Sequence, residues 1–208
     1  MPIELDHLVY AGPDLQALID EVHRLTGVEP VAGGRHEGRG TANALLGLGA
    51  GRYLELLGPD PDQPEPDRPR PLRVDEVDRP TLVGWAVRTS AIDDVVASAR
   101  EAGYDPGDVQ AMSRRTPSGD VLRWRLTPPE GGLGGAVPFL IDWQDSPHPS
   151  HGLPEVGLHG LTITCPEAAQ VSTALGAVGA AELAAVSEGP VLRLSAELDT
   201  AGGIRTLG

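Results

Sequence analysis

The chain has 208 residues, of which 40% are hydrophobic and 22% charged, a composition typical of a globular protein. Its sixteen basic residues are all arginine, which excludes chemistry that needs a lysine amine or a lysine-dependent phosphate loop. The net charge of −14 argues against a nucleic-acid partner, and no apolar run approaches the roughly 18 residues that span a membrane. We therefore expect a cytoplasmic protein.

The first 58 residues predict a strand, a helix and three further strands. Residues 3–11 are rich in apolar and β-branched side chains, which favours a strand. Apolar residues at three- and four-residue spacing then follow Pro13-Asp14 up to Gly27, and this pattern predicts a helix with one buried face. Further strands are expected near 29–35, 41–48 and 52–58.

The same order of elements recurs from residue 82 and, in shortened form, from residue 157. Between the first two copies, seven prolines among many charges predict a semi-rigid, solvated connector, although this segment could instead wrap one module as an ordered arm. The predicted organisation is a first βαβββ module at 1–58, a linker at 59–80, a second module at 81–150 and a βαβββ-like unit at 151–208.

Two polar residues in the predicted strands of the first module are candidates for function. His7 is in its first strand, and Glu55 is in its last strand. A carboxylate in the middle of such a strand is costly to bury without a cation, a metal or a hydrogen-bond donor. His7 and Glu55 could therefore face a functional cleft, or they could bond to each other as core residues. When the copies are aligned, Trp85 takes the position of His7, and we assign Asp142 to the position of Glu55.

Four segments carry a family resemblance: LDHLVYAGPDL, GGRHEGRGTANALLGLGAGRYLELLGPDP, LRWRLTPPE and PFLIDWQDSPHP. They span most of residues 3–150 and resemble the vicinal oxygen chelate superfamily, which includes glyoxalases, fosfomycin and bleomycin resistance proteins and extradiol dioxygenases. The likeness is greatest to its glyoxalase-like domain proteins. This resemblance implies an α+β fold in which paired βαβββ modules form a half-barrel, here with a shortened third unit.

The resemblance also implies a divalent metal held by the first and last strands of the modules. Carried over by position, His7, Glu55 and Asp142 are the predicted metal ligands. Trp85 departs from the pattern because an indole cannot ligate a metal, so water or His36 could complete the site. Histidine and carboxylate ligands suit Fe, Mn, Zn or Ni, and such an ion would act as a Lewis acid.

Glu55 and His36 are the candidate catalytic residues, although His36 could be a simple loop residue. Asn43 could contact a substrate or cap a turn, and His148 could be only a loop residue between two prolines. The candidate substrate-binding residues are Asn43, Trp85, Arg115, Trp124, Arg125 and His148.

Two functions are compatible with these residues. The first is a metal-dependent lyase, isomerase or dioxygenase that acts on a small oxygen-rich molecule. The second is a metal-free protein that binds and sequesters a small molecule, which the aromatic surfaces of Trp85 and Trp124 favour. In both, the partner is a small-molecule ligand. The third unit could cover a sheet edge or form a homodimer contact.

Overall fold

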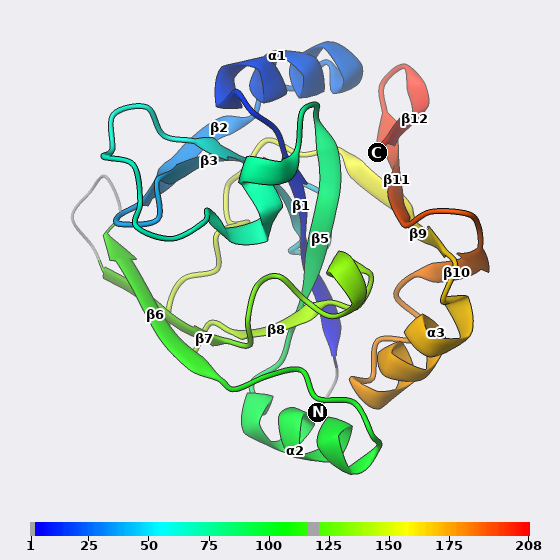
Figure 1. Cartoon of the computed structure of the whole chain (residues 1–208). Helices are drawn as coiled ribbons and strands as arrows, with labels where there is room; N and C mark the ends of the chain where they lie inside the picture. Colours follow the sequence, from blue (N-terminus) through cyan, green and yellow to red (C-terminus); the bar gives the residue numbers. More distant parts are fainter. Residues whose placement is uncertain (1–2, 116–120) are drawn as a thin grey trace.

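The computed structural model describes residues 3–115 and 121–208 (Figure 1). Its strands and helices follow the order expected for three successive βαβββ units. The first unit contains β1 Glu4–Ala11, α1 Leu15–Thr26, β2 Val31–His36, β3 Thr41–Gly47 and β4 Tyr53–Pro59. The second contains β5 Thr81–Arg88, α2 Ile92–Glu101, β6 Gln110–Arg115, β7 Val121–Leu126 and β8 Phe139–Asp142. The third contains β9 Gly157–Cys165, α3 Ala168–Ala177, β10 Ala185–Glu188, β11 Arg193–Thr200 and β12 Gly203–Leu207.

The first two units form one eight-stranded sheet in the order β2-β3-β4-β1-β5-β8-β7-β6. In each unit the last strand runs parallel to the first, β4 beside β1 and β8 beside β5. The antiparallel pair of β1 and β5 then joins the two units at the centre of the sheet. This curled sheet confirms the predicted α+β half-barrel of paired modules.

The third unit forms a separate four-stranded sheet in the order β10-β9-β11-β12. It keeps the element order of the other units but pairs its strands differently. Here β10, the first strand after the helix, runs parallel to β9, whereas the last strand has this place in the first two units. Figure 1 shows this sheet and α3 together on one side of the molecule, with α1 and α2 at opposite ends.

The helices follow from local sequence signals. In α1, the Asp14 carboxylate accepts a hydrogen bond from the backbone N–H of Ala17, and Gly27 ends the helix in the left-handed conformation that glycine favours. Leu18 and Val22 are fully buried on one helical face. None of the helices in the described ranges combines the length and hydrophobicity that a membrane span requires.

Two hydrophobic clusters cover opposite faces of the large sheet. The larger contains Leu8, Leu54 and Trp85 together with apolar side chains from the three α-helices and the second sheet. The smaller contains Val9, Leu57 and other residues of the concave face. The third unit therefore packs on the convex face, and the concave face is left for a cavity.

Part of the proline-rich segment 59–80 packs over this concave face. It contains η1 (Pro71–Glu76), a short 3-10 segment in which Leu72 and Val74 are buried within the smaller cluster. The backbones of Leu72 and Arg73 have positive φ angles of 56° and 58°, a conformation that is strained for residues with a side chain. This part of the chain is thus an ordered arm, while the domain boundaries at 58 and 80 stay predictions.

Candidate functional site

The concave face of the large sheet holds a cavity of about 440 Å³, within the range of small-molecule sites. Its two sides differ in chemistry. The first module supplies the polar side chains His7, His36, Asn43 and Glu55. The second module supplies the largely apolar side chains Met112, Trp124, Leu126, Phe139, Ile141 and Trp143. The exposed residues Arg35, Glu37 and Arg39 also line it.

Glu55 is the centre of the polar side. Its side chain points from the middle of β4 into the cavity, and only 8% of the residue is exposed. Oε1 accepts a hydrogen bond of 2.6 Å from Nδ2 of Asn43 and lies 3.9 Å from Nε2 of His36. Oε2 lies 3.7 Å from Nε2 of His7. One carboxylate therefore faces two imidazoles within 4 Å.

Asn43 is positioned by the glycine pair in β2. Its Oδ1 accepts a hydrogen bond of 2.7 Å from the backbone N–H of Gly34. A Cβ atom at Gly33 would lie 2.2 Å from the same oxygen, so only glycine permits this approach. The pairing of β2 with β3 also shifts register at this point. The Gly-Gly sequence therefore aims the Asn43 amide at Glu55.

Two aromatic side chains and a hydrogen bond at Nδ1 hold the His7 ring in place. The ring stacks on Tyr53, with centroids 4.6 Å apart, and meets Phe139 edge-on. Its Nδ1 bonds to the carboxylate of the neighbouring residue, Asp6. A register shift in the pairing of β1 with β5, between Leu5 and His7, interrupts the regular alternation of this strand.

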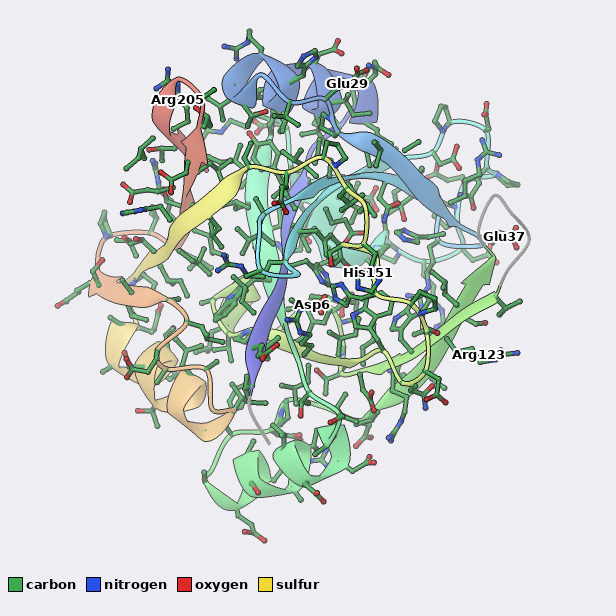
Figure 2. All side chains as sticks on the ribbon, turned by 180° about the vertical axis from the view of Figure 1, so that it is seen from behind. Asp6, Glu29, Glu37, Arg123, His151 and Arg205 are labelled. Carbon is green, nitrogen blue, oxygen red and sulfur yellow. The ribbon has the colours of Figure 1, made fainter. Side chains whose placement is uncertain are left out.

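The Asp6 carboxylate is completely buried behind His7. Its Oδ2 accepts hydrogen bonds from Nε1 of Trp143 at 3.0 Å and from Nε2 of His148 at 2.8 Å. Burial alone would raise the pKa of Asp6, but the hydrogen bonds from His148 and His7 outweigh it and hold the pKa far below its ordinary value. Figure 2 shows Asp6 near the centre of the view, with His151, from the segment between β8 and β9, close to it.

The structure does not bring Asp142 to the cavity. In β8 it is Ile141 that lines the cavity, whereas Asp142 pairs with Arg125 of β7 and accepts a hydrogen bond from the backbone of Gln144. Adjacent residues of a strand point to opposite faces, so an alignment that is one residue out of step moves a side chain to the wrong side. The prediction of Asp142 as a metal ligand beside His7 and Glu55 is corrected accordingly.

Two predicted substrate contacts also lie elsewhere. Trp85 is fully buried in the larger cluster, on the convex side, and donates its indole N–H to the carbonyl of Ala136. Arg125 makes a two-pronged ion pair with Asp93 of α2, also away from the cavity. Trp85 is therefore a core residue and Arg125 a surface residue.

The remaining predicted residues divide into two groups. His36, Asn43 and Trp124 line the cavity, and Nδ1 of His36 hydrogen-bonds to the hydroxyl of Thr41. His148 does not line it but contacts it indirectly, through Asp6. The Arg115 side chain lies outside the described part of the chain, so its role stays a prediction.

The predicted metal site does not fit the residues present. The cavity-facing positions of β5 and β8 that would supply the second module's ligands carry apolar residues, Ala86 and Ile141. Across residues 3–115 and 121–208, no three His, Cys, Asp or Glu side chains are arranged to hold a metal ion. The polar group in this cavity is instead an acid–base cluster around Glu55.

Sequence reasoning missed several residues of the site. The most buried of them is Asp6, for which the available signal was a carboxylate directly before the candidate His7. Arg39 lines the cavity from the turn between β2 and β3, and Leu72 lines it from the proline-rich segment. Neither position could be found from strand periodicity, because both lie outside the strands.

Solved structures with the same fold include a hypothetical protein from Staphylococcus aureus. It has 13% sequence identity and a TM-score of 0.67, over 92% of this chain and 88% of that chain. Methylmalonyl-CoA epimerase from Mycobacterium tuberculosis has 22% identity and a TM-score of 0.44, over 69% and 89%. A hypothetical protein from Bacillus halodurans has 15% identity and a TM-score of 0.46, over 71% and 99%.

No curated protein sequence matches the chain significantly. The family model described as glyoxalase-like domain matches residues 5–179, which include nearly all of both modules, the whole cavity, β9 and α3. The chain therefore belongs to the glyoxalase-like domain family, within the vicinal oxygen chelate superfamily.

Proposed function

We propose that the cavity is the active site of an isomerase or lyase that moves a proton on a small, oxygen-rich carbon acid. The observation that carries this proposal is the Glu55 carboxylate, buried in the cavity within 4 Å of Nε2 of both His7 and His36. A carboxylate and an imidazole at this spacing can act on the same small substrate as proton acceptor and donor.

The proton transfer can be followed at the level of atoms. Glu55 takes the proton from a carbon next to a carbonyl, and the electron pair of the broken C–H bond moves into the enolate. The His36 imidazole, whose Nε2 lies 3.9 Å from Oε1 of Glu55, is close enough to donate a hydrogen bond to the enolate oxygen and stabilise its charge. Return of the proton from the Glu55 carboxyl to either end of the enolate system completes an isomerisation, and departure of a β-substituent instead completes an elimination.

Asn43 sets the direction of the Glu55 carboxylate. Its amide N–H occupies Oε1, so the lone pairs of Oε2 face His7 and the interior of the cavity. The exposed Arg39 guanidinium adds positive charge among the lining residues and makes a weak contact of 3.9 Å with the sulfur of Met112. This charge favours a substrate that bears a carboxylate or a similar anionic group.

The proposal is tested by hydrogen–deuterium exchange. The protein is incubated in D2O with a panel of 2-hydroxy ketones, 3-oxo acids and α-branched thioesters, and ¹H NMR follows loss of the α-proton. We expect at least one compound to exchange, and Glu55→Gln to slow the exchange about 100-fold or more. Glu29→Gln, which removes an exposed carboxylate elsewhere, is the matched control and should exchange at the wild-type rate.

Equal exchange by Glu55→Gln and the wild type would overturn the proposal. So would the absence of exchange for every compound that binds. Repeating the assay with EDTA and with added Mn²⁺, Zn²⁺, Fe²⁺ or Ni²⁺ tests metal dependence separately. Because the residues do not fit the predicted ligand set, we expect EDTA to leave the rate unchanged.

The aromatic side of the cavity supports a second candidate, a protein that binds and sequesters a small molecule. Tyr53, Trp124, Phe139 and Trp143 present ring surfaces there, and such surfaces bind apolar or planar ligands without any chemistry. Quenching of tryptophan fluorescence by a compound that does not exchange would favour this function. The Trp124→Phe variant should then lose most of the signal, while Trp85→Phe should keep it.

A further inference from the structure

We propose that Asp6 is a positioning residue that fixes the tautomer of His7, so that the unprotonated Nε2 of His7 faces Glu55. This inference rests on the proposed function for its catalytic meaning, but the tautomer itself can be measured without any substrate. Asp6 does not line the cavity and acts only through His7.

The contacts of Asp6 are those of an ionised carboxylate. The carboxylate is fully buried, and three donors converge on it from His7, Trp143 and His148. An ionised carboxylate only accepts hydrogen bonds. The indole N–H of Trp143 can only donate. All three contacts are thus consistent with an ionised acceptor, and the hydrogen on each histidine must lie on the nitrogen that faces Asp6.

The two imidazoles contact Asp6 through different nitrogens. Nδ1 of His7 contacts Oδ1 of Asp6, so Nδ1 holds the hydrogen and Nε2 points toward Oε2 of Glu55. Nε2 of His148 contacts Oδ2, and its Nδ1 accepts a hydrogen bond from the backbone N–H of Ser150. One buried carboxylate therefore fixes two histidines in opposite tautomers.

These partners come from distant parts of the chain. Asp6 and His7 are in β1, whereas Trp143 and His148 follow β8, at the end of the second module. The guanidinium of Arg88 in β5 is also 4.0 Å from Oδ2. The segment after β8 thus completes the hydrogen bonds of Asp6, and its docking determines which nitrogen of His7 faces the cavity.

The effect of Asp6→Asn on His7 can be predicted because the two carboxylate oxygens of Asp6 have different partners. Two donors, from Trp143 and His148, meet at Oδ2, so the amide oxygen of the variant must stay there. The amide NH2 then faces Nδ1 of His7 and donates to it, which moves the imidazole hydrogen to Nε2. We expect the wild-type His7 to be the Nδ1–H tautomer and the variant to be the Nε2–H tautomer.

The tautomers are measured by ¹⁵N–¹H correlation NMR of the imidazole rings, with His7→Gln to assign the His7 signals. Asp60→Asn is the matched control, since Asp60 is another buried carboxylate with an arginine and a glutamine as partners. It should leave the His7 pattern unchanged. In the exchange assay, Asp6→Asn should lower the rate at least about 100-fold and change its pH profile, because the Nε2–H of His7 would then point at Oε2 of Glu55 and occupy the oxygen that takes the substrate proton.

An Nε2–H tautomer in the wild type would overturn the inference, and this result needs no variant, so it is available even if Asp6→Asn does not fold. A folded Asp6→Asn protein that keeps the Nδ1–H pattern would also overturn it. If the tautomer changes as expected but no compound exchanges protons, the inference about Asp6 stands and the proposed function fails. If Glu55→Gln abolishes exchange but the Nε2–H form of Asp6→Asn exchanges normally, the proposed function stands and the inference fails.

Discussion

Trp85→Phe should destabilise the protein without changing its cavity. The indole of Trp85 is fully buried among the side chains of the convex face, and its N–H donates to the carbonyl of Ala136 at 3.0 Å. Phenylalanine removes this donor and leaves a space beside the smaller ring. The unpaired carbonyl costs about 1–3 kcal/mol and the space about 1–2 kcal/mol, so we expect a loss of about 2–5 kcal/mol.

Equilibrium unfolding in urea measures this loss. Trp124→Phe is the matched control, because Trp124 is 9% exposed and lines the cavity on the concave face. We expect this control to lose roughly 1 kcal/mol. Acrylamide quenching gives an independent readout, since Trp85→Phe should remove the best-protected part of the tryptophan emission and Trp124→Phe a more accessible part.

A Trp85→Phe variant no less stable than Trp124→Phe would show that the Trp85 ring adds little to the core. If Trp85→Phe weakened binding of a compound as strongly as Trp124→Phe does, the Trp85 ring would contact the ligand, as its alignment with His7 first predicted. Either result would refute the placement of Trp85 in the core.

Three further changes have defined expectations. The pKa of Asp6 is lower in the folded chain than in the unfolded chain, where it is about 4. The ionised carboxylate therefore stabilises the fold fully above about pH 4, and this stabilisation is lost as the pH falls toward the folded pKa. Below about pH 4, the free energy of unfolding of Asp6→Asn should consequently depend less steeply on pH than that of the wild type. Leu72→Ala should cost about 2–3 kcal/mol in urea unfolding and admit bulkier compounds in the exchange panel, because this buried side chain lines the cavity. Gly33→Ala should slow exchange about as much as Asn43→Ala, since the new Cβ would displace the Asn43 amide from Glu55; a normal rate would contradict this.

Most of the fold could be predicted because its signals are local. The strand and helix periodicities of the three units survive in the structure with shifts of a few residues, and the glycine after α1 ends it as expected. The polar site residues of the first module could also be predicted from the sequence. His7, His36, Asn43 and Glu55 all belong to segments that resemble the family, and all four line one cavity.

The errors in the second module come from strand faces, which a sequence does not fix without the register. In the structure His7 pairs with Ala86, and Leu8 pairs with Trp85. Directly paired residues share a face of the sheet, so Trp85 lies with Leu8 in the core, and Ala86 lies on the cavity side with His7. A shift of one residue separates this pairing from the alignment that matched Trp85 to His7.

The strand irregularity in β1 explains why Asp6 was missed. Strict alternation puts adjacent residues on opposite faces, so a site residue at position 7 argues against one at position 6. The shift between Leu5 and His7 relaxes this rule and lets a buried carboxylate lie behind the ring that it bonds. Only the structure shows that Trp143 and His148, more than a hundred residues away in the sequence, also hydrogen-bond to the Asp6 carboxylate.

The two sides of the cavity differ enough to orient a substrate. Apart from Ser113 of β6, groups that hydrogen-bond or exchange protons come from the first module, whereas Phe139 and Ile141 of β8 and Trp124 of β7 offer only hydrophobic surface, apart from the indole N–H. An unpaired polar group of a substrate would be costly against that surface. The reacting carbon and its oxygens must therefore face Glu55 and His7, while an apolar substituent lies against the second module. Substitutions in β7 and β8 should consequently change which substituent is accepted, and substitutions in β1 and β4 should change the rate of proton transfer.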